Sequence, residues 1–575
     1  MSAALSPIGT KGLDNLMKGM GEGIFPPMPR ADPIEMQNAV CEAIARLIRD
    51  GQPEIAQLEA LFALERQAQP VSQLLLAQYV EGDAQIGSFE WKAWHSALRL
   101  SQSLFQVNEY FLHHIRKTGN DSWDEHEPSI QIQLFHHRNV EFLLRFLRYK
   151  KRSSELWRQL HEMYRVARER DLLNRSDAIA ETEGKHRTMR KLEQQYLQIL
   201  LLETMNSGQF SPREALWAHG WFARWSSGPG LRLAEVSGRE HFEPKGFVVD
   251  LGSSDGLKRV LVAGGNELLY FDSSPLSAMI DQETASLRDA VLPNDAAPGV
   301  RAGQLALLKR LSILFAPIPV NIERRAERKP VALAVQAIAG FSSIVGELWK
   351  SGQKQGDATS SAATPGNERS ISSFGVPTFS PLFAANADAA PISLSIADPS
   401  DVVPQIWQVK DRSDSGCRMR AQIDSLNLVI PGSLIAIRDN ETAPWTISVV
   451  RWFRRLMVDY VEIGVEYLGR EPRVVKMVAN YDGDAPIAEA PDESSRCFAA
   501  LYLPPSTEHP TMPIKTLLFP AREFRTGGDA TLLSSNATYR MRLNEPIQQQ
   551  FEYVWTSFAV TASSSSTSGK PSRPD

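Results

Sequence analysis

Residues 409–420 read VKDRSDSGCRMR, a short polar turn between two runs in which apolar residues alternate with polar ones. The turn contains Asp411, Ser413 and Gly416 in the spacing D-x-S-x-x-G. Short oxygen side chains favour turns because they bond to nearby backbone amides, and glycine allows close backbone approach because it has no Cβ. The alternation on either side predicts β-strands, so we expect a strand-to-strand connection that is rich in polar groups.

Downstream of this turn, the apolar residues keep a period of two. In YVEIGVEYL at 460–468, four apolar residues alternate with two glutamates and a glycine. The stretches LNLVIPGSLIAI at 426–437 and WTISVVRWF at 445–453 behave similarly. Several such strands separated by turns predict a small antiparallel barrel.

An arginine cluster stands upstream, in NIERRAERKPVALAVQAIAG at 321–340. Arg324, Arg325 and Arg328 directly precede an apolar run that predicts a strand. Arg324 and Arg328 form an R-x-x-x-R pattern at the beginning of that strand.

The order of these features resembles the bacterial PilZ domain, a small β-barrel whose family members bind the second messenger cyclic di-GMP. The shared features are R-x-x-x-R before the first strand, D-x-S-x-x-G in a later turn, and strands that end in VVRWF and VEIGVEYL. The resemblance implies a ligand-binding set of Arg324, Arg325, Arg328, Asp411, Ser413 and Gly416. It implies cyclic di-GMP as the ligand. The residues show no catalytic constellation, and we expect no metal site and no further cofactor.

The chemistry of these side chains agrees with that ligand. Cyclic di-GMP carries two phosphodiester charges and two guanines, and a guanidinium can fork onto phosphate oxygens, pair with guanine O6 and N7, and stack on a base. Asp411 can accept from the guanine N1 and N2 hydrogens, and the Ser413 hydroxyl can add a directional bond. Gly416 would let the backbone approach a flat base. Binding is expected to order the arginine segment and to change how the barrel contacts its neighbours.

The distance from Arg328 to Asp411 is longer than the family pattern. The excess coincides with residues 351–400, which are rich in Ser, Ala, Gly and Pro and predict a disordered insertion. Loop-closure entropy grows only with the logarithm of length, so the insertion is compatible with a barrel.

The N-terminal half has helical periodicity. In SELWRQLHEMYRVARERDLL at 154–173, the apolar residues recur on one stripe. Ser211, Pro212 and Glu214 have the spacing of a helix start with a capping box. We therefore expect an all-α domain.

The fold class expected for the whole chain is multidomain α+β. The expected segments are a flexible N-terminus at 1–33, a helical domain at 34–228, a small α+β segment at 229–320, a PilZ-like barrel at 321–480 with the insertion, a β-rich C-terminal region at 494–560, and a disordered tail at 561–575.

Composition limits the function classes. The 62 basic and 67 acidic residues give a net charge of −5, which argues against a general nucleic-acid-binding surface. Cys41, Cys417 and Cys497 are too far apart for a C-x-x-C zinc site and too few for a disulfide framework, which is typical of a reducing cytosol. With no signal peptide and no apolar stretch of about 18 residues, we expect a cytoplasmic protein without a membrane span.

The resulting hypothesis is a non-enzymatic cyclic di-GMP effector whose helical domain contacts a protein partner in motility, pilus, adhesion or polysaccharide pathways. One alternative is a scaffold whose barrel has no ligand. Another is a nucleotide-dependent enzyme that uses VVDLGSSDG at 248–256, because Gly/Ser loops after a strand direct amides at anions. For that loop a β-hairpin turn is the favoured interpretation. A calcium loop at Asp411 is disfavoured because Gln422 stands where a bidentate Glu is required.

Overall fold

The computed structural model describes residues 32–49, 53–81, 87–118, 121–150, 153–180, 187–205, 208–228, 231–235, 246–259, 267–289, 298–319, 327–360, 403–422, 429–456, 460–480, 497–505, 514–525, 527–533, 537–550 and 552–565. Almost all of the predicted flexible N-terminus and residues 361–400 of the predicted insertion lie outside these ranges. The chain divides into two compact units, residues 1–144 with 159–199 and residues 145–158 with 200–575.

The first unit is mainly helical. Its helices are α2 (Pro33–Arg49), α3 (Ile55–Glu81), α4 (Gly87–Thr118), α5 (Asp121–Asp124), most of α6 (Glu127–Leu147) and α7 (Ser154–Glu169), and the first part of α8 (Leu192–Thr204). Leu61, Leu104, Phe111 and Ile130 belong to one buried cluster that joins these helices. Burial of each such side chain stabilises the fold by about 1.5–3 kcal/mol, which is why amphipathic stripes predict this half well.

A β-hairpin interrupts the helices of this unit. Strands β1 (Ser176–Ala180) and β2 (Arg187–Lys191) pair antiparallel. The expected all-α domain therefore omits a two-stranded sheet. Each strand has only 5 residues, which is too short for a period of two to stand out from the surrounding polar sequence.

The second unit begins with helices and a small sheet. Helix α9 (Pro212–Trp225) starts with the predicted capping box: the Ser211 hydroxyl accepts from the Glu214 amide, and the Glu214 carboxylate accepts from the Ser211 amide. Strands β3 (Leu233–Glu235), β4 (Gly246–Asp250) and β5 (Leu268–Asp272) form a sheet in the order β3-β5-β4, followed by α10 (Ser274–Asp289) and α11 (Pro298–Leu314).

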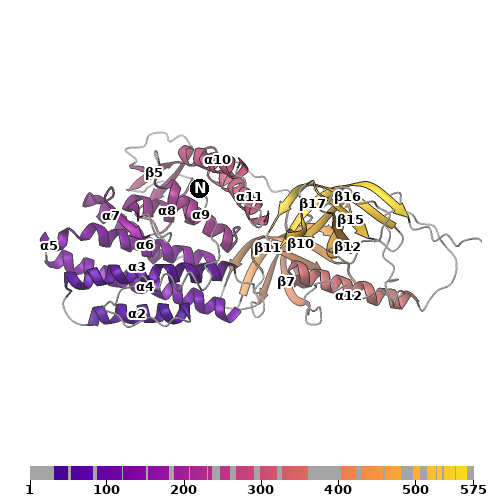
Figure 1. Ribbon diagram of the computed structural model, residues 1–575, viewed down its shortest axis with the longest axis horizontal. Coiled ribbons are helices and arrows are strands. Elements are labelled where there is room, and N and C mark those ends of the chain that lie inside the picture. The colour runs from indigo at the N-terminus through magenta and orange to yellow at the C-terminus, as the bar shows by residue number, and fades with distance from the viewer. Residues whose placement is uncertain are drawn as a thin grey trace, which may run out of the picture. The chain divides into compact units, whose positions relative to one another are not determined.

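Six strands then close the first barrel, drawn in rose and orange in Figure 1. They are β6 (Lys329–Ala339), β7 (Gln405–Ser413), β8 (Gly416–Gln422), β9 (Leu434–Arg438), β10 (Thr446–Arg455) and β11 (Tyr460–Arg470), in the order β10-β11-β8-β7-β6-β9. As the alternation predicts, Val461, Ile463, Val465 and Tyr467 point into the barrel core. The predicted fold class is confirmed: a helical N-terminal half precedes an antiparallel barrel and a β-rich C-terminal region.

The C-terminal strands close a second barrel. They are β12 (Arg473–Asn480), β13 (Cys497–Leu503), β14 (Thr516–Pro520), β15 (Asp529–Leu533), β16 (Ala537–Gln549) and β17 (Tyr553–Ser565), with a short 3-10 helix η3 (Ala521–Glu523) after β14. Numbered from the first strand of each barrel, both barrels have the cyclic order 5-6-3-2-1-4, and every pairing is antiparallel. The two barrels therefore share one connectivity.

Helix α12 (Phe341–Ser360) and both barrels share one buried cluster. The first barrel contributes apolar side chains from the outside of β9 and β10, including Leu434 and Val449. The second contributes the outside of β13, β14 and β17, including Leu501, Leu518 and Trp555. This packing covers the outer face of β9 and of the first part of β10, which carries Ile447 and Val449.

Three predicted boundaries differ from the structure. The strand at 473–480, expected in the first barrel, is β12 of the second barrel. Only Glu471 and Pro472 separate it from β11, so the sequence shows no change in periodicity between the two barrels. Residues 351–360, expected in the insertion, continue α12, whose N-terminal half is held by Ile344 and Val345 in the shared cluster. Residues 561–565, expected in the tail, belong to β17.

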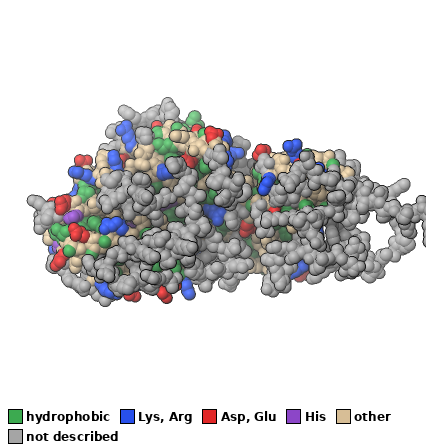
Figure 2. Space-filling view, viewed as in Figure 1, with side chains coloured by type: hydrophobic (Ala, Val, Ile, Leu, Met, Phe, Trp, Pro, Cys, Tyr) green, Lys and Arg blue, Asp and Glu red, His purple; other side chains and the backbone are tan. Residues whose placement is uncertain are grey.

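None of the described helices combines the length and apolar character needed to cross a membrane. The described residues likewise hold no group of three or more His, Cys, Asp or Glu placed to bind a metal ion. Basic and acidic side chains are interspersed over the described part of the face shown in Figure 2, in keeping with the small net charge.

Candidate functional site

The candidate site lies on the outer face of the first barrel, across β7, β8, β11 and β10. Register places Asp411 of β7 opposite Arg418 of β8, Arg418 opposite Gly464 of β11, and Gly464 opposite Trp452 of β10. Their neighbours along the strands, such as Met419 and Ile463, are buried in the barrel core. Successive side chains on a strand point to opposite faces, so the row faces outward.

Asp411 stands between two arginines in this row. Its Oδ1 lies 3.1 Å from Arg328 Nη1, and its Oδ2 lies 2.7 Å from Arg418 Nε. Arg328 is 83 positions away in sequence, immediately before β6, whose Pro330 pairs with Asp411. The structure therefore brings the arginine segment and the polar turn together through the pairing of β6 with β7. Arg324 and Arg325 lie outside the described residues.

Ser413 and Gly416 close the hairpin between β7 and β8. The Ser413 hydroxyl donates to the Gly416 carbonyl at 3.2 Å and lies 3.3 Å from the Ser415 hydroxyl. A Cβ on Gly416 would lie 2.0 Å from the Val465 carbonyl oxygen of β11. The space that this glycine leaves is thus filled by the neighbouring strand, whereas the expectation was an approach to a base. Both residues have a structural reason to be present.

A second row of charge lies beside the first. Glu462, opposite Arg420 on β8, has a side chain only 9% exposed, and its carboxylate lies 3.8 Å from Arg420 and 3.9 Å from Arg418. The side chains of Arg328, Arg418 and Arg420 are 38%, 40% and 42% exposed. Three accessible guanidinium groups therefore surround two carboxylates that are nearly covered.

The sequence-based set omitted Arg418 and Arg420. Both lie in the CRMR of the opening stretch, and their spacing of two places them on one face of β8. Since Cys417 and Met419 are apolar, the alternation alone could have assigned these arginines to the outside.

Trp452 adds an aromatic surface beside the arginines. A Cβ placed on Gly464 would lie 1.9 Å from Trp452 Nε1, so the indole occupies the space directly over this glycine. The register shifts between Val450 and Trp452, so Arg451 is the extra residue of a β-bulge. Because of this bulge, Trp452 points to the outer face, whereas strict alternation from Val450 would turn it into the barrel core. Arg451 itself bonds Glu466 at 2.5 Å. A partly exposed ring on a face that also carries arginines can stack on a base.

Titratable groups in the barrel core have no access to this face. Burial raises the pKa of the Cys417 thiol to about 11 and raises the pKa of Tyr467. At the barrel end, Arg412 forms two hydrogen bonds to Asp439, at 2.6 and 3.1 Å, and this pairing lowers the pKa of the Asp439 carboxyl. Cys417 and Tyr467 therefore add no charge to the outer row, and Arg412 and Asp439 pair with each other.

The loop at 248–256 has the geometry of a turn. Val248 and Lys258 pair antiparallel through both backbone hydrogen bonds, at 2.7 and 2.8 Å. The Asp250 carboxylate accepts the Gly252 amide at 2.9 Å, and the Ser253 hydroxyl accepts the Asp255 amide. Two of the amides that an anion would need are therefore already bonded, which confirms the hairpin interpretation.

Comparison with known families agrees with this geometry. Residues 26–234 match the model described as the cyclic-di-GMP receptor FimW, N-terminal domain, and residues 397–472 match the cyclic-di-GMP receptor FimW, middle PilZ domain. The second match begins after β6 and ends just past β11. A search of curated proteins found no match. The predicted PilZ resemblance is confirmed: the chain contains a PilZ domain, and two of its segments match domain models of the cyclic-di-GMP receptor FimW.

Proposed function

We propose that this protein is a cyclic di-GMP effector that binds its ligand on the arginine-rich outer face of the first barrel. The observation that carries the proposal is the meeting of Arg328 with Asp411, 83 positions apart, in one row with Arg418 and Trp452. The match of two segments to domain models of a cyclic-di-GMP receptor supports the same ligand.

The arginines of this face keep donors that a ligand can use. Their side chains are about 40% exposed and each guanidinium has five N–H donors, so a phosphodiester can bind the donors that Asp411 and Glu462 do not occupy. Asp411, with a side chain 13% exposed, would then accept the N1 and N2 hydrogens of a guanine. In the absence of ligand, the two carboxylates hold the arginine side chains in place. When the ligand is bound, Asp411 favours guanine over other bases.

The indole of Trp452 is proposed to stack on one guanine. Base stacking on an aromatic side chain contributes about 1–3 kcal/mol. Arg324 and Arg325 belong to the proposed site through their place in the R-x-x-x-R segment. Ser413 and Gly416 are proposed to act mainly by shaping the β7–β8 hairpin that presents Asp411.

The output is proposed to pass through protein contacts of the helical domain, in motility, pilus, adhesion or polysaccharide pathways. The three cysteines are free thiols, two of them buried, which is compatible with a cytoplasmic location. In this proposal the chain acts as a receptor and not as an enzyme.

Isothermal titration calorimetry with cyclic di-GMP tests the proposal. We expect heat of binding for the native protein and loss of at least tenfold in affinity for Arg328→Ala, since removing a charged hydrogen-bond partner costs about 1.5–3 kcal/mol. Arg224→Ala is the control, because Arg224 is also an exposed arginine in an ion pair, 2.9 Å from Glu283. No heat from the native protein would favour the ligand-free scaffold instead.

A further inference from the structure

A loop that leads into α9 is docked on strand β10 of the first barrel. The Phe453 amide donates to the Gly208 carbonyl at 2.8 Å. Gly208 has φ +72°, and a Cβ there would lie 2.2 Å from the Phe453 carbonyl oxygen. The contact therefore requires glycine both for its backbone conformation and for the close approach.

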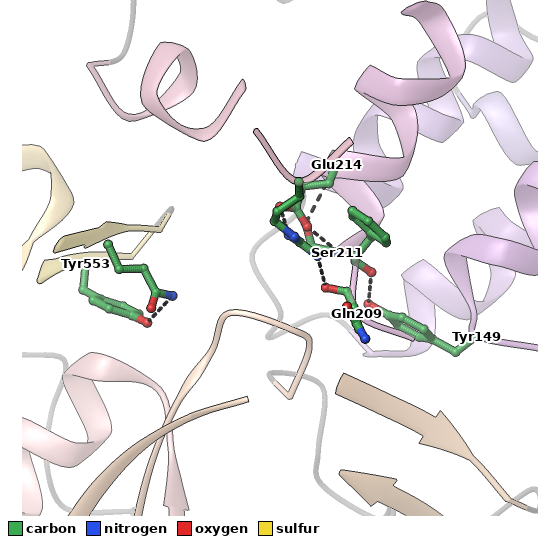
Figure 3. Close-up of polar contacts among 8 residues, drawn as sticks. Tyr149, Gln209, Ser211, Glu214 and Tyr553 are labelled. Atoms are coloured by element: carbon green, nitrogen blue, oxygen red, sulfur yellow. Dashed lines mark hydrogen bonds and ion pairs between the residues drawn. The ribbon is translucent and has the colours of Figure 1, made fainter. Parts of the chain in front are cut away.

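Tyr149 holds the same two segments together. Its ring lies 4.7 Å from the ring of Phe453, centroid to centroid, and its hydroxyl donates to the Phe210 carbonyl at 3.0 Å. Figure 3 shows this tyrosine beside Gln209, close to Ser211 and Glu214. Tyr149 has φ 52°, the left-handed conformation that ends α6: its amide donates to the Phe146 carbonyl at 2.8 Å, and the next amide, of Lys150, donates to the Arg145 carbonyl at 3.0 Å.

Arg310 of α11 fixes the loop from its other side. Its guanidinium lies 4.1 Å from the centre of the Phe210 ring and donates to the Gln209 carbonyl at 2.6 Å. It also bonds Glu214 at 2.6 Å, and Glu214 belongs to the capping box of α9. Movement of residues 208–211 would therefore disturb the beginning of α9.

The docked strand is the one that presents Trp452. Trp452 faces the proposed ligand, whereas Phe453, the next residue, lies in the barrel core and bonds Gly208. One planar peptide group joins the two residues. A shift of the Trp452 backbone therefore reorients the Phe453 amide, which donates to the Gly208 carbonyl.

We propose that β10 couples ligand binding at Trp452 to the loop at 208–211 and, through it, to the N-terminus of α9. The coupling rests on the proposed function, because cyclic di-GMP is the ligand that would move or fix Trp452. It is a coupling between two sites within one unit, and it works in both directions: loosening the loop must also change ligand affinity.

Hydrogen–deuterium exchange of the full chain, with and without cyclic di-GMP, tests this coupling. In the native protein we expect ligand to slow exchange at 208–216 by about fivefold or more, the lower end of typical coupling between sites. In Gly208→Ala, the ligand should still bind within about tenfold of the native affinity, and the slowing at 208–216 should disappear. Gly527→Ala is the matched control, because Gly527 also has positive φ, +69°, but no neighbouring atom within 4 Å of its added Cβ.

Tyr149→Phe provides a second test that removes only the hydrogen bond to Phe210 and keeps the ring packing. It should weaken the ligand-dependent slowing in a folded protein. If the native protein binds cyclic di-GMP with no change of exchange at 208–216, or if Gly208→Ala keeps the full change, the coupling is refuted and the ligand site stands. If the native protein gives no heat with cyclic di-GMP, the proposed function fails and this inference fails with it.

Discussion

The two barrels have the same connectivity but use the same outer face in opposite ways. In the first barrel, strands β7, β8 and β11 carry Asp411, Arg418 and Glu462 toward the outside. In the second, the equivalent strands β13, β14 and β17 carry apolar side chains, including Leu501 and Leu518, and this face is buried against α12 and the first barrel. Connectivity thus fixes where a face lies, and the side chains decide whether that face stays charged and accessible or is buried against another part of the chain.

Placing a charge on the covered face should have the largest effect. Leu518 is fully buried in the shared cluster. Leu518→Arg would bury an unpaired guanidinium and is expected to lower the free energy of unfolding by about 3–5 kcal/mol. Urea denaturation followed by tryptophan fluorescence measures this loss.

The control for that substitution is Leu333→Arg in the first barrel, where the leucine is already 37% exposed. It should change the unfolding midpoint little, since surface substitutions usually stay within about 0.5 kcal/mol. Equal destabilisation by both variants would contradict the view that the covered face is a core.

Removing the aromatic ring from the accessible face of the first barrel should have an intermediate effect. This effect is on ligand affinity and not on stability. Trp452→Ala deletes the ring over Gly464 and is expected to weaken cyclic di-GMP binding by about 1–3 kcal/mol, or roughly five- to 150-fold. Gly464→Ala should weaken binding in the same direction, because its Cβ displaces the indole. Unchanged affinity in both variants, measured by calorimetry, would exclude the ring from the site.

The smallest expected effect concerns pH. Arg412 lowers the pKa of Asp439 below its ordinary value of 3.8, so the pair stabilises the folded state at pH values well above 3.8 and loses this contribution as the pH falls through the lowered pKa. Because the Asp439 side chain is 46% exposed, Asp439→Asn should cost at most about 0.5 kcal/mol at pH 7. The difference between variant and native protein in urea titrations should vanish in strong acid; a difference that grows there would reverse the assigned sign.

Much of the first barrel was predictable from sequence, because β11 alternates apolar with polar or small residues and its apolar face lies in the barrel core. Val461, Ile463 and Val465 carry that signal. The juxtaposition of Arg328 with Asp411 could be anticipated only from the order of the motifs, since it depends on the pairing of β6 with β7. The position of Trp452 over Gly464 depends on a bulge at Arg451, which has no sequence signature here.

Other features depend on tertiary packing that a local pattern does not encode. Helix α12 continues into a polar stretch that composition alone assigns to a loop, because its N-terminal half is anchored by Ile344 and Val345. The second barrel begins only two residues after the first ends, so its β12 reads as a continuation of the same alternating pattern. Closure of each barrel is a property of six strands together and is not visible in any one of them.

The most direct test is a crystal structure of the protein with cyclic di-GMP bound. The account predicts phosphodiester oxygens within hydrogen-bonding distance of Arg328 and Arg418, a guanine edge on Asp411 and a guanine plane on Trp452. A ligand bound to the second barrel, or to the first barrel away from β7, β8 and β11, would contradict it.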